Sequence, residues 1–99
     1  MLSSKTTTPF GTVSHEARIQ QLGNGQLVIH VDSTLGQVKH HHSTTVGTSN
    51  GKNDLLYQPN TTDSDLVAQL QKHLDRVRAD ASNVLAARAR LQKLSSQLS

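Results

Sequence analysis

The residues of this sequence whose types and spacing could do chemistry are three consecutive histidines in the stretch KHHHSTT, residues 39–45. Alternate side chains of an extended strand lie on one face, so His40 and His42 would point together and His41 away from them. Two imidazoles could share a transition-metal ion, but a zinc site uses three or four protein ligands. No typical metal-site spacing relates the other candidates, which are His15, His30 and Asp32. We therefore expect no metal and no other cofactor, and His40 and His42 remain weak candidates.

No arrangement of a nucleophile, a base and an orienting group can be argued from this sequence. Serine and threonine are abundant because the first half of the chain is low in complexity. Glu16 has no acidic partner nearby in the sequence, and no glycine-rich loop separates a strand from a helix. These observations predict a protein that is not an enzyme.

Composition divides the 99 residues into two unlike segments near residue 62. All six glycines and both prolines precede Asp63, and only 33% of the chain is hydrophobic. Since there is no cysteine and no apolar run long enough to span a membrane, we expect a cytoplasmic chain. Mitochondrial import is a lesser alternative, suggested by an N-terminus with Lys5, many hydroxyl residues and no acid before Glu16.

The segment from residue 63 to residue 99 reads as one long helix. It is rich in Ala, Leu, Gln and Arg, which lose little side-chain freedom in a helix. Thr62, Asp63 and Ser64 are all able to cap its first amides. The pattern predicts a helix over residues 63–98.

Apolar residues recur along this helix in alternating steps of three and four, the period of a coiled coil. The predicted partner-binding seam consists of Val67, Leu70, Leu74, Val77, Ala81, Val84, Arg88, Leu91 and Leu98. Further apolar residues flank it, namely Leu66, Leu85 and Leu94. A stripe this broad indicates a bundle of three or more helices. Because no acid follows Asp80, a carboxylate that pairs with Arg88 must come from another chain or from far upstream, and we expect another chain.

Three alternatives to a helical protein partner are weaker. The helix could fold back onto residues 10–57, but that region offers few apolar residues to cover it. Nucleic-acid binding is disfavoured because the basic residues are dispersed and acidic residues precede the heptads. Four aspartates in residues 63–82 disfavour direct membrane binding. The expected partners are therefore other helical subunits in a heteromeric complex.

Residues 1–62 are predicted to be a low-complexity, mostly disordered region. A weak β-hairpin over residues 17–32 is the one structured alternative, with Asn24 and Gly25 as its turn. Because a lone hairpin is marginal in water, it would need a third strand such as residues 36–46. The predicted fold class is thus mainly α, with a long coiled-coil helix at the C-terminus.

These features together predict a small, non-enzymatic coiled-coil subunit, adaptor or scaffold of a heteromeric complex. Its C-terminal helix would pack into a multi-helix bundle of trafficking, organelle-positioning or cytoskeletal type. The alternative is a homotrimeric fibrous structural protein, with an N-terminal β region and a trimerising helix. The first hypothesis predicts that the chain binds a different protein, whereas the second predicts that it associates with copies of itself.

Overall fold

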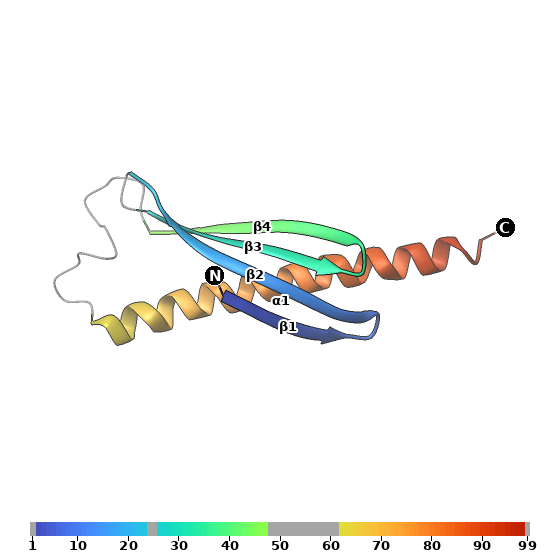
Figure 1. Cartoon of the computed structure of the whole chain (residues 1–99), viewed down its shortest axis with the longest axis horizontal. Helices are drawn as coiled ribbons and strands as arrows, with labels where there is room; N and C mark the ends of the chain where they lie inside the picture. The colour runs from blue at the N-terminus through green and yellow to red at the C-terminus, as the bar shows by residue number, and fades with distance from the viewer. Residues whose placement is uncertain (1, 24–25, 48–61, 99) are drawn as a thin grey trace.

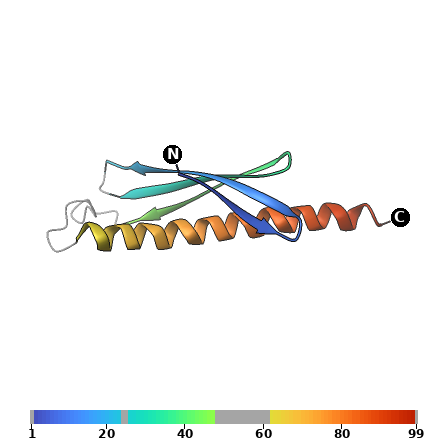
Figure 2. The same cartoon turned by 60° about the horizontal axis from the view of Figure 1, so that its bottom comes forward.

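The computed structural model describes residues 2–23, 26–47 and 62–98. These residues form, in chain order, β1 (Leu2–Thr8), β2 (Gly11–Gln21), β3 (Leu27–Leu35), β4 (Val38–Val46) and α1 (Asp63–Ser95). The strands make one antiparallel sheet in the order β1-β2-β3-β4. Figure 1 shows α1 running along one face of this sheet, and Figure 2 shows the same two layers from another side.

The prediction of a mainly α chain with a disordered N-terminal region is wrong, because strands occupy most of residues 2–46. The hairpin considered at residues 17–32 exists as the pairing of β2 with β3, and the suggested third strand exists as β4. The turn at Asn24 and Gly25 lies outside the described residues. Low hydrophobicity misled the prediction, because an antiparallel sheet needs an apolar surface on one face only.

Burial along β2 and β3 alternates residue by residue, as a half-buried sheet requires. On β2, Val13, His15 and Ala17 point toward α1 and are fully buried. Their neighbours in the sequence face solvent. On β3, the buried positions are Leu27, Ile29, Val31 and Ser33. The helix-facing surface is therefore narrow, and small or polar residues occupy part of it.

The turn between β3 and β4 depends on Gly36. The register pairs Leu35 with Val38, which leaves Gly36 and Gln37 as a two-residue loop. Gly36 has φ +62°, and no non-glycine residue of the described chain has a positive φ. This is the φ pattern of a type II′ turn, which places glycine first because other residues are strained there. The turn fixes which residues of β4 face the helix.

The prediction that the helix starts near residue 63 is confirmed. The Thr62 side chain accepts a hydrogen bond from the Asp65 amide at 3.1 Å, and α1 begins at Asp63. Asp63 and Asp65 lie in the first turn and Lys93 in the last, which suits the helix dipole. In the part of the chain that the structure describes, no helix has both the length and the apolar character needed to cross a membrane.

The core lies between α1 and the sheet. Its main cluster consists of Ala17, Leu27, Ile29, Val31, Val46, Leu74 and Val77. Val13, Ala81 and Leu85 are buried outside that cluster. The register places one transverse row of polar residues between Ala17 and Val13, and we call it the polar row: Ser4, His15, Ser33 and His40.

Candidate functional site

The first half of the predicted seam packs against the chain's own sheet, except Val67, which is 63% exposed. Leu74, Val77 and Ala81 are buried, and Leu74 and Val77 belong to the main core cluster. Leu66 and Leu70 are partly buried against the same cluster. In this half the helix folds back on its own chain, which was the less favoured interpretation of the sequence. The β strands cover this half of the helix, although the low apolar count of residues 10–57 predicted too little apolar surface for that.

The second half of the seam turns away from the sheet. Val84 is half-buried, but Leu91 and Leu98 are 65% and 80% exposed. The residues that face the sheet here are Leu85, which is buried, and Ala89, which is half-buried. A straight α-helix has 3.6 residues per turn, so a heptad line drifts by about 20° per heptad around it. Contact with the sheet therefore passes from the seam to the flanking position Leu85.

The C-terminal end of α1 extends past the ends of the strands (Figures 1 and 2). The last helix residues beside the sheet are Ala89 and Gln92, which line an open hollow of about 360 Å³ with Phe10 and Val38. Beyond this hollow, no strand of the described chain covers the helix. We call the exposed leucines at this end the leucine stripe: Leu91 and Leu94 in the last turns of α1, and Leu98 just after it. The helix ends at Ser95, three residues before the predicted end at residue 98.

Basic residues surround the leucine stripe. Arg88, Arg90 and Lys93 lie along it, and no acidic residue follows Asp80. Within the described ranges, no carboxylate lies within ion-pair distance of Arg88. The Arg88 charge instead acts on His40 of β4, where burial is the larger cause of a lowered pKa and Arg88 the next. The expected pairing of Arg88 with an acid of another chain stays a prediction.

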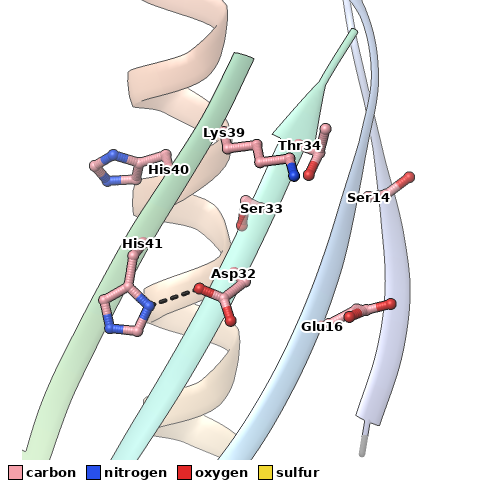
Figure 3. Close-up of a pocket in the computed structure, with 8 residues that line it drawn as sticks. All are labelled: Ser14, Glu16, Asp32, Ser33, Thr34, Lys39, His40 and His41. Atoms are coloured by element: carbon pink, nitrogen blue, oxygen red, sulfur yellow. Dashed lines mark hydrogen bonds and ion pairs between the residues drawn. The ribbon is translucent and has the colours of Figure 1, made fainter. Parts of the chain in front are cut away.

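The outer face of the sheet, opposite α1, carries a line of titratable side chains across three strands. The register places Glu16 opposite Asp32, and Asp32 opposite His41. They border an open hollow of about 590 Å³ (Figure 3). His41 Nδ1 donates to Asp32 Oδ1 at 2.7 Å, which partly offsets the repulsion between the two carboxylates.

A second histidine extends this line diagonally. His30 Nδ1 lies 3.4 Å from His41 Nε2, and the ring centroids are 5.3 Å apart. His30 Nε2 lies 2.9 Å from the Gln20 side-chain oxygen. The pKa of His30 is lowered mainly by desolvation and then by the charges of Arg18 and His41, whereas Asp32 raises it. We call His30 and His41 the outer histidine pair.

The metal candidates from the sequence, His40 and His42, lie on the helix-facing side of β4. Their ring centroids are 5.7 Å apart. The positive charge of Arg88 beside His40 disfavours a bound cation there. Among the described residues, no three histidine, aspartate or glutamate side chains converge as a metal site would require.

His15 lies buried at the centre of the polar row. We considered it from the sequence only as a possible metal ligand and did not predict its place in the core. His15 is 1% exposed, and its Nδ1 lies 2.7 Å from Ser33 Oγ. Its Nε2 lies 2.9 Å from Thr6 Oγ1 and 3.2 Å from Ser82 Oγ. Burial and then the Arg78 charge lower its pKa, so it is held neutral.

A serine beside a histidine could serve as nucleophile and base, but this group lacks access and orientation. Ser33 and Ser82 are 1% and 4% exposed, and no carboxylate is hydrogen-bonded to His15. The three hydroxyls satisfy the imidazole inside the sheet–helix interface. Its sequence signal was the alternation of Val13, His15 and Ala17, which places His15 among inward-facing residues.

The candidate functional surfaces are therefore the leucine stripe and the outer face of the sheet. Both depend on the sheet, which covers about the first two thirds of the helix and leaves its last turns exposed. No protein-family model, curated protein or solved structure matches this chain significantly.

Proposed function

We propose that this chain is a non-enzymatic interaction subunit that docks its leucine stripe onto a helix of a different protein. The observation that carries this proposal is the exposure of Leu91, Leu94 and Leu98, which are 65%, 47% and 80% exposed, at a helix end that extends past the sheet. Leu91 and Leu94 lie three residues apart in the last turns of α1 and share one side of it, and Leu98 follows just after the helix ends at Ser95. An amphipathic helix binds a partner because the complex removes the apolar side of the helix from water.

Charge favours a different protein over a second copy. Residues 83–99 carry Arg88, Arg90 and Lys93 and no acid. Two copies of this end, packed in parallel or antiparallel, would bring basic residues together. A partner helix with glutamates beside its apolar seam would instead complement them. The partner is therefore an acidic amphipathic helix.

The expected affinity is modest. Three leucines and their neighbours bury much less than the roughly 1,600 Å² of a standard interface. We expect a dissociation constant in the micromolar range, typical of transient or multivalent assembly, with the sheet as a rigid base. A cytoplasmic complex of trafficking, organelle-positioning or cytoskeletal type is the setting that we propose for it.

The test uses the full chain and a labelled peptide of about four heptads, with leucine at a and d and glutamate at e and g. Fluorescence anisotropy should show binding that weakens at least tenfold for the double variant Leu91→Gln, Leu94→Gln. The matched control is Val67→Gln, because Val67 is a similarly exposed apolar residue of α1, at 63%. It should bind like the wild type.

A second peptide, with lysine in place of every glutamate, tests the charge argument. It should bind at least tenfold more weakly than the acidic peptide. Equal binding of the two peptides, or equal weakening by Val67→Gln, would show that the proposed surface is wrong. Sedimentation of the chain alone should give a monomer at micromolar concentration. A discrete trimer would instead support the homotrimeric fibrous protein.

A further inference from the structure

The hydrogen bonds of the outer histidine pair indicate which ring nitrogen carries the proton when each imidazole is neutral. The Asp32 carboxylate can only accept, so His41 carries its proton on Nδ1. The Gln20 side-chain oxygen also accepts, so His30 carries its proton on Nε2. A neutral imidazole has one proton only. The two remaining nitrogens, His30 Nδ1 and His41 Nε2, therefore present lone pairs to each other.

Those two nitrogens are 3.4 Å apart. Two lone pairs at this distance repel each other unless a proton or a metal cation lies between them. With Zn–N bonds of about 2.0 to 2.1 Å in tetrahedral geometry, two ligand nitrogens are separated by about 3.3 to 3.4 Å. Adjacent positions of a square-planar ion would bring them to about 2.8 to 2.9 Å at similar bond lengths. The observed separation matches the tetrahedral ion.

The groups behind the two rings are those that support metal-binding histidines. A ligand histidine usually donates its other N–H to a carboxylate or another oxygen, which fixes the tautomer and orients the ring. Asp32 does this for His41 and Gln20 for His30. The carboxylates of Asp32 and Glu16 favour a cation on this face. Arg18, which pairs with His30 in the register, weakens that preference.

We propose that His30 and His41 form a two-ligand site for Zn²⁺ on the outer face, with His30 binding through Nδ1 and His41 through Nε2. Asp32 and Gln20 are positioning residues, and water completes the coordination. Because no third histidine, aspartate or glutamate of the described chain joins the pair, the affinity is far below that of a four-ligand structural site. We expect a dissociation constant on the order of 10 µM.

The test is to titrate the full-length chain with zinc alone near neutral pH and to measure binding by isothermal titration calorimetry. His30→Ala and His41→Ala should each weaken binding at least tenfold. His42→Ala is the matched control, because it removes an adjacent histidine of the same strand from the opposite face. That control should change the affinity by less than about twofold. Circular dichroism should confirm that every variant is folded.

Two further measurements separate this site from a chance affinity of the histidine run. Asp32→Asn should weaken zinc binding by roughly tenfold, since it alters the group that orients His41 and removes a negative charge that favours a cation on this face. Imidazole ¹⁵N spectra should show zinc on Nδ1 of His30 and Nε2 of His41. Wild-type affinity in His30→Ala would overturn the proposal, as would a larger loss in His42→Ala than in His30→Ala.

Discussion

His15 shows how a single polar side chain can be accommodated at the centre of a small core. Its two ring nitrogens have Thr6, Ser33 and Ser82 as hydrogen-bond partners, contributed by β1, β3 and α1. An unpaired polar group at this depth would cost about 1 to 3 kcal/mol, which the hydroxyls avoid. One neutral imidazole on β2 thereby links β1, β3 and α1 through side-chain hydrogen bonds.

The lowered pKa of His15 predicts that stability falls in mild acid. The ordinary pKa is 6.5 and the folded pKa lies below it, so the unfolded chain takes up the proton first as pH falls. The stabilising contribution is present above about pH 6.5 and is lost below it, by at most about 1.4 kcal/mol per pH unit. Urea denaturation at about pH 7.5 and pH 5.5 measures this loss.

The control for that prediction is His15→Gln, which keeps hydrogen-bonding groups and removes the titration. Arg78 faces the imidazole from α1 and stays in place in the variant. The variant should lose less stability between the two pH values than the wild type. An equal loss in both proteins would mean that other groups, such as His30 and His40, cause the acid sensitivity.

At the scale of elements, the sheet is built from strands that look disordered by composition. Threonine, serine and lysine fill the outward positions of β1 and, with His41, those of β4, and the apolar positions lie mainly in β2 and β3. Order therefore depends on turn geometry and register as much as on hydrophobic burial. The loop between β3 and β4 has only Gly36 and Gln37, so its backbone conformation is essential.

We predict that Gly36→Ala destabilises the protein by about 1 kcal/mol, because alanine is strained at φ +62°. Nothing lies within 4 Å of the added methyl group, so conformation alone causes the loss. Gly23→Ala is the matched control, because it also meets nothing within 4 Å and has no positive φ. It should be neutral or slightly stabilising. Urea midpoints compare the two, and equal midpoints would contradict the type II′ assignment.

At the scale of the whole molecule, one helix performs two tasks along its length. The chain measures 61 Å in its longest dimension and only 24 × 17 Å across, because α1 outruns the sheet that it covers. The first two thirds of α1 complete the core. The last turns extend into solvent with exposed leucines, and they contribute little to the stability of the isolated chain.

This division predicts opposite effects for two leucines of α1. Leu85→Ala should cost about 2 to 5 kcal/mol, because Leu85 is 1% exposed against the sheet. Leu91→Ala should change stability by less than about 0.5 kcal/mol, because Leu91 is 65% exposed. Chemical denaturation measures both. A coiled-coil seam would give the reverse order, with Leu91 more sensitive than the flanking Leu85.

Local signals in the sequence predicted the structure correctly where a short segment alone determines whether a helix starts or a strand forms. Thr62 and the aspartates after it mark the helix start, and the alternation in residues 26–31 marks a strand. These signals work because capping and period-two burial depend on residues close in the chain. The heptad pattern was also local, but it could not say whether a helix or a sheet covers the seam.

Only the tertiary structure decided which surfaces are buried and which remain exposed. Ser82 meets His15 across 67 positions of the chain, and His30 meets His41 only through the register of β3 with β4. The same register separates His41 from His40 and His42, which the sequence places side by side. The drift of a straight helix then leaves Leu91 exposed and buries Leu85. Each of these outcomes depends on contacts between distant segments, which no local pattern of residues encodes.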